Sequence, residues 1–259
     1  MRKSLLAIFA SSLSSIAGSV LAADMPVNGP WSSPVVAFTW TSCYLGAHVG
    51  GGWAHKDITD PVQVAQDAVI GPGTTVGVTT ATVSPSGVVV GGQIGCDYQF
   101  ASNWVIGVEG AVSGSNMKGS TIVGLPAGFA GDQALISART DFIPSVTARF
   151  GYAMDRVLLY AKGGVAWAGD KYTVTGSLAG TGFDFQGLDT RTGWTTGAGV
   201  EWAFSRNWSA SIEYDYYSFG SGTILMSDSI NGFTGLVDIK QSVQVVKAGL
   251  NFHVWSSGW

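Results

Sequence analysis

One short turn pattern recurs three times along the chain. The stretch QFASNWVIGVEG returns as AFSRNWSASIEY and, more faintly, as YAMDRVLLYAKG, and the turn residues Asn103, Asp155 and Asn207 follow one another at a constant spacing (103 to 155, and 155 to 207). Each copy joins two runs in which apolar residues occupy every second position, which is typical of a β-hairpin. Three such hairpins predict six strands.

Two further alternating runs flank these six, so the sequence predicts eight strands. Their expected ranges are 38–54, 87–100, 104–115, 136–152, 157–168, 190–204, 208–219 and 238–254. Four stretches rich in Gly, Thr, Ser and Asp connect the hairpins, and we expect them to be long loops at 56–86, 116–135, 169–189 and 220–237. Short turns then lie at one end of the sheet and long loops at the other.

The two faces of the expected strands differ in chemistry. One face carries apolar side chains such as Trp104, Ile106 and Val108, whereas the other carries small residues and nearly every strand charge, Glu109 among them. Only 12% of the residues are charged, against about 25% in a soluble domain, and 37 are Gly. Because small residues suit a narrow interior, we expect the polar face to line the lumen of an all-β, eight-stranded antiparallel up-and-down transmembrane β-barrel.

A soluble barrel of the lipocalin kind is the alternative, and it reverses this arrangement, with bulky apolar groups inside and charges outside. The aromatic residues favour the membrane barrel, because Trp and Tyr gather at the two interfaces of a membrane. They occur near the strand ends, which predicts two aromatic girdles, formed by Trp53, Trp104, Trp167, Trp194, Trp202, Trp208 and Tyr216.

The first residues, MRKSLLAIFASSLSSIAGSVLA, combine two basic residues, an apolar stretch and small residues before Ala22. This pattern is typical of a secretory signal peptide, with a membrane-anchoring helix as the alternative. We therefore expect a signal peptide at 1–22, a Pro-containing periplasmic tether at 23–37, the barrel at 38–254 and a short tail at 255–259. The cell outer membrane of a Gram-negative envelope is the expected location.

Four stretches together resemble a known family. WTSCYLGAHVGGGW, GGQIGCDYQF, NWVIGVEG and KAGLNFHV are similar to segments of the small outer-membrane β-barrel proteins of alphaproteobacteria, the OmpA-like β-barrel porin family. The resemblance implies an integral outer-membrane protein with a structural or surface role and porin-like passage of small solutes. Surface binding of haemin is the alternative function, and an outer-membrane lipid-modifying enzyme is a further one.

The resemblance also has implications for partners and for the two cysteines. The last strand is similar to the family's assembly signal, with Phe252 and Val254 near its end, which implies recognition by the barrel-assembly machinery. Other expected partners are outer-membrane lipid and extracellular ligands at the long loops. Members of the family carry Cys at positions matching Cys43 and Cys96, so a cross-strand disulfide is one expectation and two free buried thiols the other.

The charged residues of the inward face are the candidate site residues. They contain both signs, so ion pairs can compensate the cost of burial, and a structural role is expected for them: Asp97, Glu109, Asp141, Arg149, Lys162, Arg191, Glu201, Glu213, Asp215 and Lys247. For Glu109 the expected partners are Lys162 and Arg149. The narrow interior of an eight-stranded barrel argues against a wide pore.

Signatures of other chemistry are weak. The histidines are His48, His55 and His253, and His55, at the base of a loop, is the weak candidate for cofactor binding, namely of haem. No metal site and no resident cofactor is expected, and without converging catalytic groups we expect no enzyme. The net charge of −4 without a Lys/Arg cluster also argues against a nucleic-acid partner.

Overall fold

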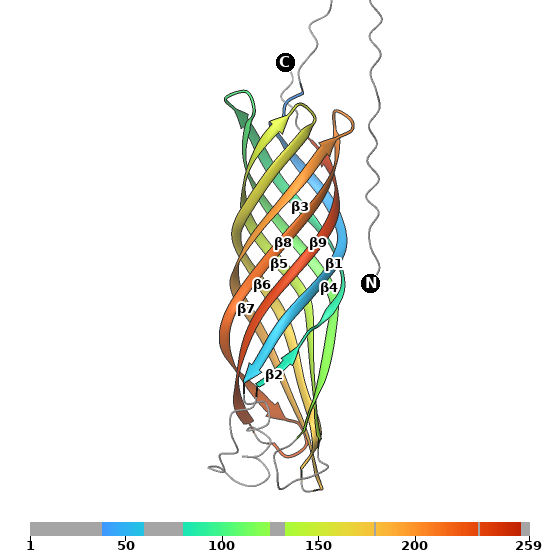
Figure 1. Cartoon of the computed structure of the whole chain (residues 1–259), viewed down its shortest axis with the longest axis vertical. Helices are drawn as coiled ribbons and strands as arrows, with labels where there is room; N and C mark the ends of the chain where they lie inside the picture. Colours follow the sequence, from blue (N-terminus) through green and yellow to red (C-terminus); the bar gives the residue numbers. More distant parts are fainter. Residues whose placement is uncertain (1–37, 60–79, 125–132, 179, 233, 255–259) are drawn as a thin grey trace, which may run out of the picture. The chain divides into compact units, whose positions relative to one another are not determined.

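Nine strands form one antiparallel sheet in the computed structural model, which describes residues 38–59, 80–124, 133–178, 180–232 and 234–254 (Figure 1). The expected signal peptide, tether and tail lie outside these residues. No helix that could cross a membrane is found in the described part of the chain. The strands are β1 (Ser42–Thr59), β2 (Thr80–Val83), β3 (Ser86–Phe100), β4 (Trp104–Gly124), β5 (Gln133–Met154), β6 (Val157–Leu178), β7 (Thr181–Ala203), β8 (Trp208–Asp228) and β9 (Thr234–His253).

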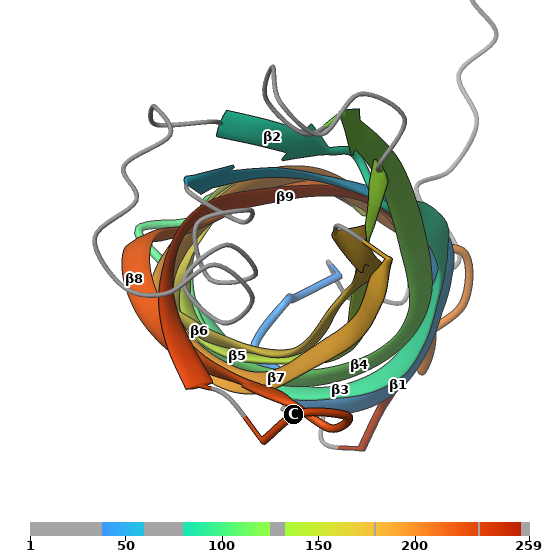
Figure 2. The same cartoon turned by 90° about the horizontal axis from the view of Figure 1, so that it is seen from below.

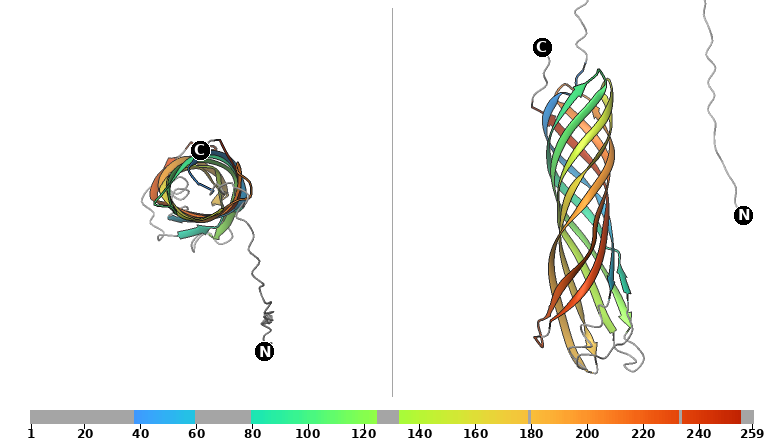
Figure 3. Two further views of the ribbon diagram at one scale, coloured as in Figure 1. Left: turned by 90° about the horizontal axis from the view of Figure 1, so that it is seen from above. Right: turned by 90° about the vertical axis from the view of Figure 1, so that its left-hand side faces the viewer.

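Eight of the strands close into a ring, and the short β2 pairs only with the far end of β1. The ring closes because β1 pairs with β9 from Tyr44 opposite His253 to Thr59 opposite Asp238. Views along the barrel axis show the closed ring (Figure 2; Figure 3, left). The eight-stranded antiparallel barrel expected from the sequence is therefore confirmed. Closure satisfies the backbone groups of β1 and β9 that would otherwise form open edges.

The repeated asparagine joins two of the short turns to the end of a neighbouring strand. Asn103 donates from its side-chain amide to the carbonyl of Ala153 at 2.7 Å, and its own carbonyl accepts from the Ala153 N–H. Asn207 makes the same pair of contacts with His253, at 2.9 Å from the side chain. The repeated asparagine in the sequence therefore corresponds to a repeated contact between a short turn and the end of a neighbouring strand. Asp155, in the faintest copy, instead has a positive φ of 53° and its carbonyl accepts from the indole N–H of Trp40.

Several strands are much longer than expected from the sequence, namely β4, β6, β7 and β8, whereas β1 and β3 have about the expected length. The stretches 116–135, 169–189 and 220–237 are mostly strand, since β4 ends only at Gly124 and β5 already begins at Gln133. The prediction of long loops there is wrong. Of the expected loop 56–86, residues 60–79 lie outside the described part of the chain. Figure 1 shows β4 to β9 continuing side by side far from the short turns.

The two halves of the barrel differ in the side chains that line the interior and the outer wall. Near the short turns the outward side chains are large and apolar, as at Val108, where 61% of the residue is exposed, and the inward ones are charged. Farther along the same strands the interior is mainly apolar, with Ile136 and Phe183 buried inside, and the outer wall carries cations such as Lys171 together with exposed apolar residues such as Leu188. Alternation with an apolar interior is what a barrel in water requires. The rule of a polar interior therefore holds for only half of the barrel.

Candidate functional site: the barrel lumen

Buried charges from seven strands, β3 to β9, meet in the lumen at the half near the short turns. We call this group the charged layer. All of its members are at most 5% exposed, and it consists of Asp97, Glu109, Arg149, Lys162, Glu201, Glu213, Asp215 and Lys247.

Glu109 lies at the centre of this layer. Its Oε1 is 3.0 Å from Lys162 Nζ, and its Oε2 is 3.6 Å from an Arg149 guanidinium nitrogen and accepts a hydrogen bond of 2.7 Å from the Tyr44 hydroxyl. Both expected partners are therefore found beside it. Lys162 also bridges to Glu213 at 2.5 Å and to Asp215 at 3.3 Å.

Arg149 contacts two further acidic residues of the charged layer. Its guanidinium is 2.7 Å from Glu201 and 3.3 Å from Asp97, and its Cζ lies 4.1 Å from the ring centroid of Tyr160. Charges taken out of water are stable only when they are paired and hydrogen-bonded. Most of the layer meets this condition through contacts between strands that are distant in sequence, and these contacts join the barrel wall from within. Asp97 is the exception, because its carboxylate oxygens accept no hydrogen bond and have only the Arg149 charge at 3.3 Å.

Glycines make room for the long polar side chains. A Cβ added at Gly95 would lie 2.4 Å from the hydroxyl oxygen of Tyr44, and one at Gly199 would lie 2.6 Å from that of Tyr160. Both distances are shorter than van der Waals contact allows, so no other residue fits there unless the tyrosine moves. The small residues of the polar face are thus a steric requirement of the charged layer.

Beyond the charged layer the lumen is filled by apolar groups and one further polar cluster. Met117, Ile143 and Phe219 pack in the middle of the barrel. Next come Lys56 and Asp170, 2.6 Å apart, which the sequence analysis missed because both fell in expected loops. Lys56 is an even number of residues after the inward-facing His48 on β1, and Asp170 is an even number after the inward-facing Lys162 on β6. Continuing the alternation along these two strands would therefore have predicted that both residues face the lumen. The far end is closed by an apolar core that contains Ile136, Phe183 and Ile239.

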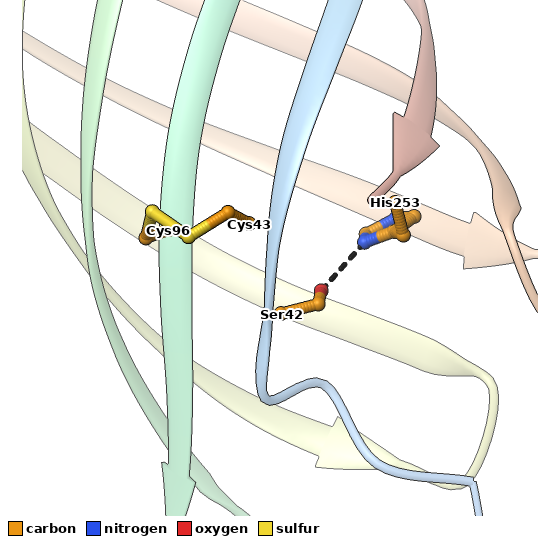
Figure 4. The surroundings of a disulfide bond; sticks show 4 residues. All are labelled: Ser42, Cys43, Cys96 and His253. Atoms are coloured by element: carbon orange, nitrogen blue, oxygen red, sulfur yellow. Dashed lines mark hydrogen bonds between the residues drawn. A yellow bond between two sulfur atoms is a disulfide. The ribbon is translucent and has the colours of Figure 1, made fainter. Parts of the chain in front are cut away.

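At the short-turn end, His253 lies between two serines. Its Nδ1 is 2.7 Å from Ser42 Oγ (Figure 4), its Nε2 is 2.9 Å from Ser209 Oγ, and Glu201 lies 3.7 Å away. Ser, His and Glu in contact is the composition of a hydrolase triad. Here both serines and the histidine are buried in the lumen under Trp40, so a substrate has no path to them in this structure. The group serves as a hydrogen-bonded end layer.

The two cysteines lie opposite each other on β1 and β3. Cys43 and Cys96 are register partners, and the structure joins them by a disulfide with an S–S distance of 2.06 Å (Figure 4). The alternative of two free thiols is not what the structure shows. The bond links neighbouring strands on the outer wall, one position from the lumen residues Ser42 and Asp97.

A comparison with family models decides the class of the chain. Residues 42–252 match the model described as the outer membrane protein beta-barrel domain, which covers the whole ring from β1 to β9. The chain belongs to this family of outer-membrane β-barrel proteins. Its location is accordingly the outer membrane, and its outward apolar belt contacts membrane lipid.

Two curated relatives agree with the family. The chain is 31% identical to the 31 kDa outer-membrane immunogenic protein of Brucella melitensis over 95% of this chain and 98% of the relative. It is 26% identical to the 25 kDa outer-membrane immunogenic protein of Brucella ovis over 83% and 90%. Among solved structures it is similar to the outer membrane protease OmpT of Escherichia coli, with 10% identity, a TM-score of 0.49, and coverage of 85% and 99%.

In this outer-membrane barrel, eight of the ten predicted lumen charges form the charged layer. Arg191 is also buried but lies farther along the lumen, where it contacts Asp189 and the carbonyls of Gly222 and Ile239. The prediction for Asp141 is wrong. A β-bulge next to it on β5 turns its carboxylate to the outer side, where it contacts Arg139, because a bulge shifts the alternation by one residue.

The histidines do not converge in the barrel. His48 is buried and hydrogen-bonds to Gln93 and Ser113, whereas the side chain of His55 is 57% exposed on the outer face, 3.3 Å from Asp57. Within the described residues no group of three or more His, Cys, Asp or Glu side chains is placed to hold a metal ion. The aromatic residues predicted for the girdles all lie on the outer wall, whereas Trp40, which was not among them, is buried in the barrel end.

Proposed function

We propose that this protein is a non-enzymatic structural element of the outer membrane that presents its far end at the cell surface and holds its lumen closed to passive solute flow. The observation that carries this proposal is the filled interior. Glu201 and Asp215 in the charged layer, and Lys56 and Ile239 beyond it, expose 0% of their surface. A conducting pore needs water along its whole length, and water would leave these side chains exposed.

Surface presentation rests on the orientation of the barrel. Outer-membrane barrels have short periplasmic turns and longer extracellular connections, so the end opposite the short turns, which carries β2, is the extracellular one. The relatives from Brucella are named as immunogenic outer-membrane proteins, and an immunogenic membrane protein must offer surface outside the lipid. Both observations support a role in presenting protein surface beyond the membrane.

The closed lumen is tested by conductance. Reconstituted in planar bilayers, the wild-type protein is expected to give no steady open-channel steps, because both the charged layer and the apolar groups fill the barrel. Lys162→Gln serves as the probe of any current that is observed. Steady steps whose size changes in Lys162→Gln would show that solutes pass through the lumen, and porin-like passage would then replace the closed-barrel proposal.

The orientation is tested by labelling in intact cells. Asn231→Cys places a thiol at the exposed connection between β8 and β9, and Arg206→Cys places one at the exposed turn between β7 and β8. A bulky polyethylene-glycol maleimide is expected to label Asn231→Cys almost completely and Arg206→Cys not at all until the cells are lysed. Labelling of Arg206→Cys alone would reverse the orientation.

A further inference from the structure

Three cations form a straight row across the outer wall of the barrel. Lys118 on β4 is the register partner of Arg139 on β5, and Arg139 is the register partner of Lys171 on β6. All three point outward, with Arg139 and Lys171 side chains 48% and 59% exposed. Like charges directly opposite each other across strands destabilise a sheet. A row of three cations therefore carries a repulsion that one nearby carboxylate, that of Asp141, compensates only in part.

Other outward charges of this barrel are arranged in the usual way. On the opposite side of the ring, Lys240 of β9 is the register partner of Asp57 on β1, which is a complementary pair. In the row, the neighbouring carboxylate is that of Asp141, which contacts Arg139 Nε and lies 3.8 Å from Lys171 Nζ. One carboxylate against three cations leaves an excess of positive charge at this surface.

A second row, of hydroxyl groups, runs parallel to the cations. Two residues farther from the membrane along the same strands, Ser120 is the register partner of Ser137, and Ser137 that of Thr173. Both rows line one hollow of ≈ 450 Å³ on the outer wall. Ammonium, guanidinium and hydroxyl groups together are the side chains that bind phosphate oxygens. The hollow thus offers donors to a phosphorylated ligand.

The height of the row above the lipid indicates the source of the phosphate. Phe142 on β5 and Trp167 on β6 lie at the extracellular rim of the apolar belt. Phe142 is three residues after Arg139 and Trp167 is four residues before Lys171, so both lie nearer to the short turns than these cations. At about 3.3 Å per residue the cations lie roughly 10–13 Å farther along the strands than these aromatic groups. This is the level of the headgroups of the outer leaflet, which in a Gram-negative outer membrane are phosphorylated saccharides.

From these observations we propose that Lys118, Arg139 and Lys171 form a binding site for the headgroup phosphates of lipopolysaccharide on the outer wall of the barrel. The bound phosphates offset the repulsion within the row. The lipid then stabilises one side of the barrel, the side of β4, β5 and β6, rather than surrounding the protein uniformly.

The test compares the full-length wild-type protein, folded in detergent micelles, with the triple variant Lys118→Gln, Arg139→Gln, Lys171→Gln. The probes are purified rough-type lipopolysaccharide and the same material after enzymatic removal of its phosphates. The wild type is expected to bind the phosphorylated form roughly tenfold more tightly than the triple variant does, a difference that salt reduces. The two proteins are expected to bind the dephosphorylated form equally.

Lys240→Gln is the matched control, since it removes an exposed cation from the opposite side of the ring and is expected to bind as the wild type does. Equal binding of lipopolysaccharide by the wild type and the triple variant would overturn the proposal, as would wild-type binding that does not depend on the phosphates. Dextran sulfate provides a third probe. If the triple variant loses affinity for this soluble polyanion but keeps its full affinity for lipopolysaccharide, the surface binds soluble polyanions and the proposal is wrong.

Discussion

Arg149→Met is expected to lower the free energy of unfolding by about 3–5 kcal/mol, because removing one partner of a buried ion pair leaves the other charge without compensation. Arg149 is the cation nearest to Glu201, at 2.7 Å, and also lies 3.3 Å from Asp97. Methionine fills much of the volume but gives these carboxylates no positive charge. Denaturant unfolding of the protein in detergent micelles, followed by the shift in electrophoretic mobility between folded and unfolded barrel, measures the loss.

Arg139→Met is the matched control for this substitution. It removes an arginine from the same strand, β5, but from the outer wall, where about half of the side chain is exposed. Exposed ion pairs contribute about 0–1 kcal/mol, so its effect is expected to be small in micelles that contain no lipopolysaccharide. If Arg149→Met and Arg139→Met lower the free energy of unfolding by the same amount, the charged layer does not stabilise the barrel wall.

Val108→Arg is expected to cost about 2–4 kcal/mol in a lipid bilayer, the cost of placing an arginine near the midplane on the lipid-facing side of a β-barrel. Val108 belongs to the outward apolar belt and lies between Cys96 and Ala148 on the neighbouring strands. Folding titrations in bilayer vesicles measure this cost directly.

Ala111→Ser is the control on the inward face of the same strand. Ala111 is 5% exposed and has Gln93 and Ser145 as register partners, so a new hydroxyl finds polar groups within reach. Ala111→Ser is therefore expected to change the folding free energy only slightly. A Val108→Arg variant that is no less stable than Ala111→Ser would contradict the assignment of the two faces.

The half of the barrel inside the membrane could be predicted well from the sequence, for a physical reason. Lipid allows no polar group on the outer wall, so the alternation around Val108 and Glu109 identifies both faces without any structure. The pairing of Cys43 with Cys96, which the family resemblance implied, depends on the register of the first hairpin, and the structure supplies this register. The contacts of Glu109 with Lys162 and Arg149 follow from strand order and parity.

The half of the barrel outside the membrane could not be predicted from this alternation, because its outer wall faces water instead of lipid. Beyond Trp167 the outer side chains of β6 face water, so Lys171 points outward and Val174 inward, and the sequence resembles a polar loop. Lys56 and Asp170 were missed for this reason. Asp141 was misplaced because a single bulge, with no clear signature in the residues around it, inverts the alternation locally.

The length of the strands sets how far the protein rises from the cell. With 18–23 residues in β1 and in β4 to β9, a rise of about 3.3 Å per residue and a tilt of roughly 40°, the wall is about 50 Å tall, whereas the apolar band of such barrels is about 25 Å. The connections at the end away from the short turns therefore lie about 25 Å beyond the hydrocarbon, at the end of the closed barrel wall. In the proposed orientation, these connections face the outside of the cell and lie within reach of large molecules.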